Sequence, residues 1–408
     1  MEENSLHLDR LKSDIIQQQL KTHPFLIIYG PRKCGKSTLI RHIASDYPEA
    51  VYLDLAHHGD LKKLEEPEWY LMHQQEKFLC IDNADRKPEL HALIRKLRKN
   101  RNTSGHILLL ESTRPGKQKP ENQPVDEQIP AIHLSPLLWE EVSQHVSLQT
   151  YLERGGYPQS LLQPDTVTSI LWRDAYITTL LEQDIQRLKR VSFTSIRRLW
   201  QMLAHENGEV IKLTSTGNSL GVSHTTVRNY LTLLHRSFMI TMLQPFIFTT
   251  RKRLVKSPKI YIADTGIALT LLGIQDFNQA VGHPAFASLW ASLVLNNIQG
   301  KFSGYSLTYY RTSNGAEADI VMQKSGRLIV IICKTAMTPT LSRSNTAAIA
   351  ELVPVHTFIV APVDHGFRIR TGITVVSLPE LLNELETLLT ILDVLPPPGD
   401  ATMATDHE

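Results

Sequence analysis

A glycine-rich motif near the N-terminus constrains this chain more than any other feature. Residues 30–37 read Gly-Pro-Arg-Lys-Cys-Gly-Lys-Ser, and the apolar run Phe25–Tyr29 directly before them predicts a strand. The spacing is that of a phosphate-binding loop, in which backbone N–H groups curl around phosphates at the N-terminus of a helix. Residues 38–43 continue with the apolar spacing of such a helix. The motif therefore predicts a binding site for a nucleoside triphosphate.

The motif also gives its polar residues separate tasks. The Lys36 ammonium neutralises the terminal phosphates, and the Ser37 hydroxyl is a ligand for Mg²⁺. ATP with Mg²⁺ is the expected cofactor. The residues predicted to bind it are those along the loop, namely Gly30, Lys33, Gly35, Lys36, Ser37 and Thr38.

Length and composition predict several soluble domains. A chain of 408 residues is too long for one core, so two or three domains are expected. Apolar residues make up 42% and charged residues 21%, which is typical of globular proteins. The net charge of only +2 gives no overall electrostatic argument for nucleic acid binding.

Cysteine usage and the N-terminus indicate a cytoplasmic location. Cys34, Cys80 and Cys333 are far apart in sequence and fit neither a metal cluster nor a disulfide framework, which favours a reducing compartment. The first ten residues are too charged for a signal peptide, and no apolar run approaches membrane-spanning length. We therefore expect no membrane partner.

The first third of the chain alternates strands with helices. Residues 51–55, 77–82 and 105–112 read as strands, and residues 90–101 as a helix between them. This alternation predicts a parallel sheet flanked by helices. The strand at 77–82, which is the third after those at 25–29 and 51–55, ends at Asp82. This is the position of the Walker B aspartate that helps hold Mg²⁺ in P-loop proteins.

The pattern changes after residue 132. Residues 151–200 read as helices, and residues 204–249 as a winged helix with a first helix at 215–220, a recognition helix at 224–235 and a wing at 238–248. Strands follow at 307–311, 319–323, 328–334 and 357–360. The predicted division is a P-loop domain at 1–145, a helical lid at 146–200, a winged helix at 201–268, a further α/β domain at 269–392 and a disordered tail at 393–408.

The order of motifs resembles a known family. The motifs that carry this resemblance stand at residues 30–39, 134–141 (Leu-Ser-Pro-Leu-Leu-Trp-Glu-Glu), 154–158 (Arg-Gly-Gly-Tyr-Pro), 256–266, 281–284 and 310–319. Together they resemble prokaryotic ATP-binding proteins that join an AAA-type P-loop ATPase to a winged helix and a C-terminal domain similar to PD-(D/E)XK nucleases. The resemblance covers nearly the whole chain and implies an α/β fold with ATP and Mg²⁺ as cofactors.

Two positions depart from that family near the nucleotide. Members usually follow the Walker B aspartate with Glu, which polarises the attacking water, and here that residue is Asn83. An amide cannot accept a proton, so a general-base contribution of roughly 10²- to 10⁴-fold is at risk. Glu111 stands at the sensor position and is a speculative replacement base. The preferred alternative is that Glu111 faces solvent or pairs with Arg114.

Two further motifs keep both a functional and a structural interpretation. Residues 155–158 mark the lid of this family, and Gly-Gly followed by Pro also explains an ordinary turn between helices. In the winged helix, Arg228 and His235 stand where DNA contacts occur, and residues 251–253 with Lys256 and Lys259 add basic residues after the wing. Winged helices of AAA-type proteins also act as packing modules. DNA is therefore an alternative partner.

The C-terminal domain lacks part of a nuclease site. Such a site needs a carboxylate on a helix, an Asp on one strand and Glu-X-Lys on the next, so that oxygens hold Mg²⁺. Asp319 and Lys334 are present, but Ile332 and Ala291 stand where the two glutamates belong. With Glu317 as the other nearby acid, we expect an inactive nuclease-like module without metal-dependent cleavage.

These observations predict an ATP-binding, AAA-like P-loop protein with a slow or weak ATPase and a regulatory or scaffolding role. Lys36, Asp82, Asn83 and Glu111 are the candidate catalytic residues, and Ser37 with Asp82 the Mg²⁺ ligands. The alternative is a nucleotide-regulated protein that binds or processes DNA through the winged helix. A protein partner or an oligomer fits either function.

Overall fold

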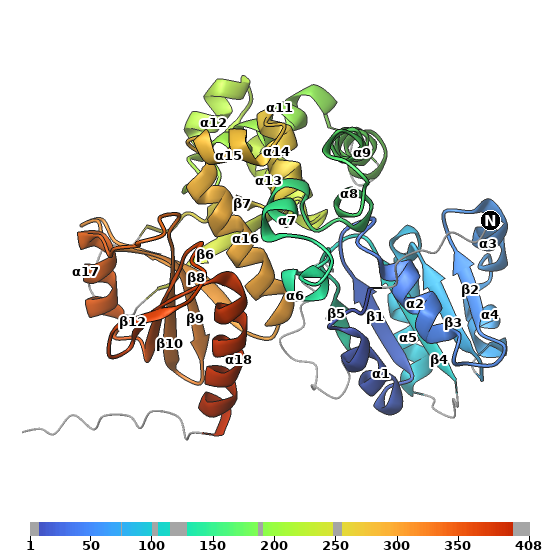
Figure 1. The fold of residues 1–408 in the computed structure, drawn as a ribbon. Helices are drawn as coiled ribbons and strands as arrows, with labels where there is room; N and C mark the ends of the chain where they lie inside the picture. Colours follow the sequence, from blue (N-terminus) through green and yellow to red (C-terminus); the bar gives the residue numbers. More distant parts are fainter. Residues whose placement is uncertain are drawn as a thin grey trace, which may run out of the picture. The chain divides into compact units, whose positions relative to one another are not determined.

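The computed structural model describes residues 8–74, 76–99, 105–114, 129–186, 191–247 and 255–394. The chain divides into two compact units (Figure 1). Met1–Leu199 and Thr225–Ile240 form the first unit, and Trp200–His224 and Thr241–Glu408 form the second. Of the tail predicted at 393–408, residues 395–408 lie outside the described residues.

A five-stranded parallel sheet is the centre of the first unit. Its order is β2-β3-β4-β1-β5, and every pair in it is parallel. The strands are β1 (Phe25–Tyr29), β2 (Val51–Asp54), β3 (Phe78–Asp82), β4 (His106–Glu111) and β5 (Ala131–His133). The predicted parallel sheet is thereby confirmed, and β4 lies between the strand before the phosphate-binding loop and the strand that ends at Asp82.

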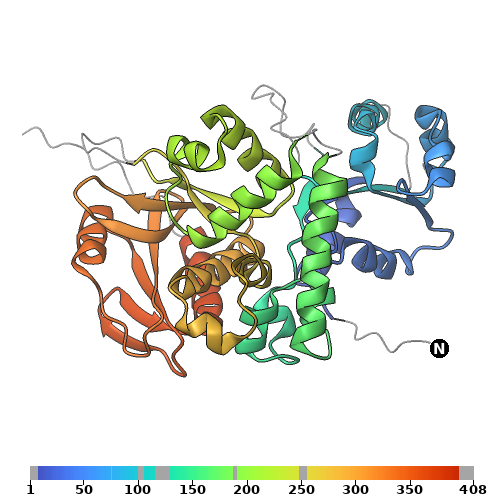
Figure 2. The same cartoon turned by 90° about the horizontal axis from the view of Figure 1, so that it is seen from above.

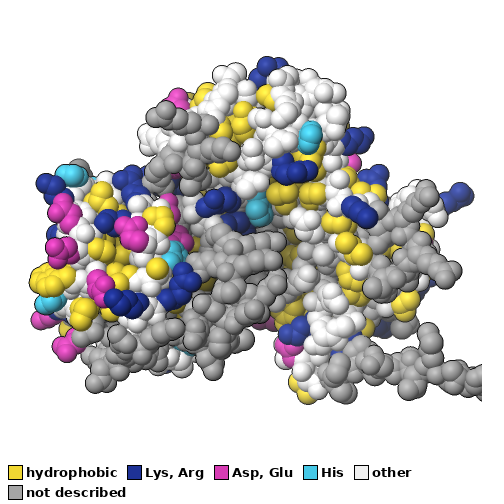
Figure 3. Space-filling view, turned by 180° about the vertical axis from the view of Figure 1, so that it is seen from behind, with side chains coloured by type: hydrophobic (Ala, Val, Ile, Leu, Met, Phe, Trp, Pro, Cys, Tyr) yellow, Lys and Arg dark blue, Asp and Glu magenta, His cyan; other side chains and the backbone are white. Residues whose placement is uncertain are grey.

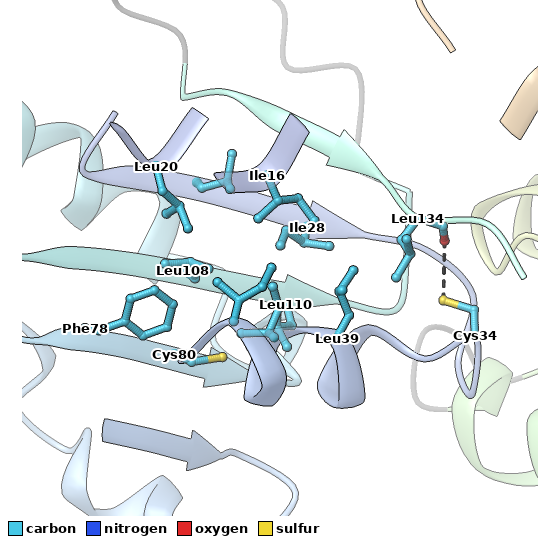
Figure 4. Close-up of a cluster of buried hydrophobic side chains, with 13 residues drawn as sticks. Ile16, Leu20, Ile28, Cys34, Leu39, Phe78, Cys80, Leu108, Leu110 and Leu134 are labelled. Carbon is cyan, nitrogen blue, oxygen red and sulfur yellow. Dashed lines mark hydrogen bonds between the residues drawn. The ribbon is translucent and has the colours of Figure 1, made fainter. Parts of the chain in front are cut away.

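Helices cover both faces of this sheet because alternate strand residues point to opposite sides. Figure 4 shows one face, where α1 (Ser13–Thr22) and α2 (Lys36–Ala44) pack on Ile28, Leu108 and Leu110. The other face packs against residues of α4 (Pro67–His73) and α5 (Glu89–Lys99). The short helix α3 (His58–Lys63) follows β2.

A run of helices follows β5. They are α6 (Trp139–Val142), α7 (Leu148–Arg154), α8 (Pro158–Leu161) and α9 (Thr166–Thr179), and a π-helix (Leu180–Ile185) extends α9. The next helices are α11 (Phe193–His205), α12 (Leu213–Leu220) and α13 (His224–Arg236). Gly217 is required in α12, because a Cβ there would lie 2.7 Å from the Val222 carbonyl oxygen.

The region predicted as a winged helix contains the expected helices but is divided between the units. The split places α12 in the second unit and Thr225–Ile240, which holds nearly all of α13, in the first. The predicted wing contains β6 (Ile240–Pro245), which is a member of the eight-stranded sheet of the second unit. The basic run at 251–253 lies outside the described residues.

A mixed eight-stranded sheet forms the second unit, in the order β12-β13-β11-β10-β9-β8-β6-β7. The strands that follow β6 are β7 (Lys259–Ile262), β8 (Ser306–Arg311), β9 (Glu317–Lys324), β10 (Arg327–Cys333), β11 (His356–Val360), β12 (Phe367–Arg370) and β13 (Ile373–Val376). β8, β9 and β10 form an antiparallel meander, and β11 then pairs with β10 in parallel.

Helices lie on both sides of this second sheet. They are α14 (Thr265–Leu272), α15 (Phe277–Gly282), α16 (Phe286–Lys301), α17 (Arg343–Leu352) and α18 (Leu378–Val394). Figure 2, with Figure 1, shows α17 on one side of the sheet and α18 on the other. Within the described part of the chain, no helix has the length and apolar character needed to cross a membrane.

One buried carboxylate joins the N-terminal segment to the rest of the first unit. The two oxygens of Glu141 accept hydrogen bonds from Arg10 Nε at 3.1 Å, Leu11 N at 2.8 Å and Leu138 N at 2.8 Å. The guanidinium of Arg10 also donates to the carbonyl oxygens of Cys34 and Ser135, at 2.9 and 2.7 Å. Glu141 thus fixes Arg10 against the phosphate-binding loop.

We expect Glu141→Ala to lower the free energy of unfolding by about 3–5 kcal/mol, because it leaves a buried guanidinium without its carboxylate. The two side chains of the pair are only 6% and 1% exposed. Chemical denaturation measures the loss. The exposed neighbour Glu140, changed to Ala, is the control, and an equal loss in both variants would contradict this role of Glu141.

Candidate functional site

The phosphate-binding loop follows β1 and begins α2. Gly35 has φ +100°, a conformation that costs little only for glycine. Gly30 is required for a different reason, because a Cβ there would lie 2.0 Å from the Leu134 carbonyl oxygen. Lys36 is buried, and its Nζ donates to the carbonyl oxygens of Gly30 at 2.9 Å and Pro31 at 2.8 Å. The ammonium is therefore held over the loop.

Asp82 and Ser37 meet, as the sequence predicted for two ligands of one metal ion. Ser37 Oγ donates to Asp82 Oδ2 at 2.5 Å, and the Tyr52 hydroxyl donates to the same oxygen. Burial, then the hydrogen bond to Asp82, raises the pKa of Tyr52, so the hydroxyl keeps its proton. No group of three or more metal-binding side chains occurs in the described ranges. Two hard oxygen ligands suit Mg²⁺ shared with phosphates.

The Asn83 amide is committed to a second carboxylate. Asn83 has φ +54°, a left-handed conformation in which Asn is enriched, and its Nδ2 donates to Asp54 Oδ1 at 2.8 Å. Sequence reasoning missed Asp54, which ends β2 and pairs in register with Asp82. The signal was present, since the second predicted strand also contains an Asp, but only the sheet order places the two side by side.

The burial and the partner of Glu111 both differ from those that the sequence predicted. It is buried rather than facing solvent, and its partner is His91 rather than Arg114, with 2.5 Å between His91 Nε2 and Glu111 Oε1. Strand alternation explains this, because Glu111 follows Ile107 and Leu109 on the face that α5 covers. Ser112, the next residue, lines the nucleotide pocket instead.

A pocket of about 430 Å³ opens over these groups. Its polar wall includes Lys36, Ser37, Asp54, Asp82, Asn83 and Ser112. A more apolar wall comes from the N-terminal segment and the helices after β5, and it consists of Leu8, Leu137, Pro158, Gln159 and Leu162. The volume lies in the range usual for small-molecule and cofactor sites.

The motif at 155–158 lies in the first unit as a turn that also contributes to the pocket. Leu137 N donates to Gly156 O at 2.7 Å, and a Cβ on Gly156 would lie 2.4 Å from the Leu137 carbonyl oxygen. The Tyr151 hydroxyl also donates to the Leu137 carbonyl oxygen, at 2.8 Å. The motifs at 134–141 and 154–158 are therefore neighbours, and Pro158 lines the pocket.

The C-terminal end of α13 packs at the carboxyl end of the first sheet. The rings of Tyr29, His133 and Phe238 stack, and the Arg114 guanidinium lies 4.4 Å from the Phe238 ring centroid. Burial lowers the pKa of His235 to about 4. His235 is therefore neutral at physiological pH, which corrects its prediction as a cation for DNA.

A lysine ammonium lies beside the two acids of the predicted nuclease-like site. Lys259 Nζ lies 2.7 Å from Glu317 Oε1 and 4.0 Å from Asp319 Oδ1, and the lysine side chain is 5% exposed. Burial raises the pKa of Asp319 and the Lys259 charge opposes that rise. Ile332 and Ala291 are both buried and their side chains carry no oxygen or nitrogen, so neither position offers a ligand. Lys259 is therefore buried against these carboxylates, which corrects its prediction as a cation for DNA.

Charge is mixed at the surface as well. Figure 3 shows Lys and Arg side chains interspersed with Asp and Glu on the face that it draws, as expected for a net charge of +2. Specific recognition must then come from local groups, such as those of the pocket, rather than from the overall field.

Three domain families match this chain in sequence. Residues 22–143 match a family described as AAA domain, residues 145–278 a domain of unknown function (DUF8612), and residues 286–381 another domain of unknown function (DUF4143). The chain is also 31% identical to the uncharacterized proteins Rv2008c of Mycobacterium tuberculosis and Mb2031c of Mycobacterium bovis, over 92% of this chain and 86% of each relative.

Similarity to solved structures is more distant. The Walker-type ATPase PABY2304 of Pyrococcus abyssi is 15% identical over 65% of this chain and 96% of its own, with a TM-score of 0.45. RuvB of Thermotoga maritima, solved as a point variant, is 15% identical over 57% of this chain and 86% of its own, with a TM-score of 0.29. Scores this low support no statement about activity. The AAA domain itself implies nucleotide binding, typically with Mg²⁺.

We expect Lys259→Met to lower the free energy of unfolding by about 3 kcal/mol, because two partly buried carboxylates lose their nearest cation while the volume is kept, and Arg311 remains only 3.7 Å from Glu317. Lys324→Met is the matched control, because it removes a more exposed ion pair with Asp393. It should change the urea concentration at the unfolding midpoint little. Urea denaturation compares them. Equal effects would mean that Lys259 has no special electrostatic role.

Proposed function

The chain belongs to the same family as these mycobacterial proteins, and on this premise we propose that it binds ATP with Mg²⁺, hydrolyses it slowly and serves a regulatory or scaffolding role. One observation carries the proposal. The Lys36 ammonium and the Ser37–Asp82 oxygen pair line the same pocket as the backbone of the loop. This combination supplies a cation, a metal site and N–H donors for a triphosphate.

The residues that line the pocket suit both the phosphates and the base of a nucleotide. Lys36, Ser37 and Thr38 with the N–H groups at Gly35 would hold the phosphates, and Asp82 would share the metal ion. Gly30 and Lys33 shape the loop itself. Leu8, Leu137, Pro158 and Leu162 would enclose the base, where the Gln159 amide can donate to and accept from its edge. Bound Mg²⁺ would neutralise charge on the phosphates.

Slow hydrolysis follows from the chemistry beside Asp82. Asn83 has no carboxylate, and its amide donates to Asp54. We infer that Asp54, rather than Glu111, is the acceptor for the proton of the attacking water. Asp54 lines the pocket at the end of the strand beside Asp82, whereas Glu111 points to the face that α5 covers. Asn83 would then orient Asp54.

The alternative function is DNA binding through α13, regulated by the nucleotide. Its support is a stripe of exposed polar residues at helical spacing, formed by Thr225, Arg228, Asn229, Thr232 and Arg236. Arg and Asn are the side chains that most often read base edges in the major groove. A salt-dependent DNA shift assay separates this function from the first.

We propose that the second unit is a nuclease-like module that does not cleave nucleic acid and that its strands have a structural role. The helix α16 followed by the β8-β9-β10 meander, α17 and β11 has the order that such domains use, and this supports the resemblance. The Lys259 ammonium supports its inactivity. Lys334 and Asp319 remain from the expected site.

We expect Lys36→Ala to weaken the binding of ATP with Mg²⁺ by roughly tenfold or more, because charge-assisted hydrogen bonds to phosphate are lost. Titration calorimetry measures the dissociation constants. Lys21→Ala, an exposed change of the same kind on α1, should leave affinity unchanged. If the wild type binds no ATP, or Lys36→Ala binds equally well, the proposed function fails.

We also expect Asp54→Asn to lower single-turnover ATP hydrolysis by roughly 10²-fold, the usual size of a general-base contribution. Glu111→Gln should change it by less than about threefold, although both variants remove one carboxylate near the ends of the strands. Labelled ATP measures the rate, and ATP affinity is checked in parallel. The opposite ranking would identify Glu111 as the base.

A further inference from the structure

An arginine of the phosphate-binding loop also lies at the pocket. Arg32 is the third residue of the loop motif and lines the pocket together with Lys36 and Ser37. Its side chain is 32% exposed. A guanidinium offers five N–H donors in a planar fork that matches phosphate oxygens. The loop therefore brings a guanidinium, in addition to the lysines Lys33 and Lys36, to this pocket.

The helix beyond α9 holds this arginine. Arg32 Nη1 donates to Asp184 Oδ1 at 2.5 Å, and no other hydrogen bond of the Arg32 side chain occurs among the described residues. Asp184 is 14% exposed. Its second oxygen, Oδ2, is buried without a hydrogen-bond partner in the same described set. This carboxylate thus has one specific partner, and most donors of Arg32 remain for another.

The local helix geometry makes this contact. Asp184 lies in the π-helix Leu180–Ile185, a rare form that shifts the direction of the side chains after it and often occurs at functional sites. A second contact comes from α9, where the Tyr176 hydroxyl donates to the Arg32 carbonyl oxygen at 3.2 Å. Tyr176 also packs on Tyr157 of the 154–158 motif. Arg32 is therefore held by Tyr176 through its backbone carbonyl oxygen and by Asp184 through its side chain.

We propose that Arg32 binds the terminal phosphate of a nucleoside triphosphate, and that Asp184 positions its guanidinium for this contact. The inference rests on the proposed nucleotide binding and deepens it. Lys36 and the loop N–H groups serve the phosphates generally, and in this proposal the Arg32 fork, which Asp184 holds by its hydrogen bond, serves the terminal phosphate alone. Arg32 thereby distinguishes triphosphate from diphosphate and links that difference to the helix that carries Asp184.

The test compares two ligands on the full-length protein. Dissociation constants for ADP and for a non-hydrolysable ATP analogue, both with Mg²⁺, are measured by calorimetry for the wild type, Arg32→Gln and Arg32→Lys. Arg32→Gln should weaken the analogue at least tenfold and ADP less than about threefold. Arg32→Lys, which keeps the charge but loses the fork, should fall between. Arg198→Gln, an exposed change on α11, is the control.

Asp184→Asn separates positioning from a merely structural role. It should reduce the preference for the triphosphate by less than Arg32→Gln does, and the double variant should match Arg32→Gln because Asp184 acts through Arg32. Hydrogen exchange supplies a second readout. The analogue, but not ADP, should increase protection of residues 176–186 in the wild type.

The results also separate this inference from the proposed function. If the wild type binds neither ligand, nucleotide binding itself fails. If it binds both, and Arg32→Gln leaves the ratio of the two dissociation constants unchanged or weakens both ligands equally, Arg32 does not recognise the terminal phosphate. A higher triphosphate preference in Asp184→Asn would overturn the positioning role, since Asp184 would then compete with the phosphate.

Discussion

The alternation of side chains across a parallel strand determines which polar groups reach the nucleotide pocket. Asp82 lies on the face of β3 that α2 covers, so its carboxylate meets Ser37. Glu111 ends β4 with the opposite parity and joins His91, while Ser112 lines the pocket. A shift of one residue would exchange these roles. The chemistry at this edge of the sheet therefore depends on register as much as on composition.

Three separate parts of the first unit surround that edge. The N-terminal segment is held by Glu141, the turn at Gly156 packs on Leu137, and the π-helix brings Asp184 to Arg32. Arg10 and Asp184 contact the loop directly, through the Cys34 carbonyl oxygen and the Arg32 guanidinium. These contacts connect the helices after β5 to the groups that line the pocket.

The second unit contains two carboxylates that share a buried cation. Two carboxylates on β9 face a buried lysine on β7, and the position two residues before Lys334 is apolar. Burial of a carboxylate is tolerable here because Lys259 supplies the opposite charge. The same strands then gain stability from packing, with Ile332 in the core beside α17.

The sequence by itself determined the phosphate-binding loop, the strands before and after it and the position of Asp82 at the end of β3, because spacing along one chain specifies a loop whose close backbone contacts require glycine. The described strands confirm that part of the fold. Tertiary structure alone decided that Asp54 lies beside Asn83, that Glu111 pairs with His91 and that Asp184 reaches Arg32. These partners are between 20 and 152 positions apart in sequence, and sheet order and helix packing, which local patterns do not encode, bring them together.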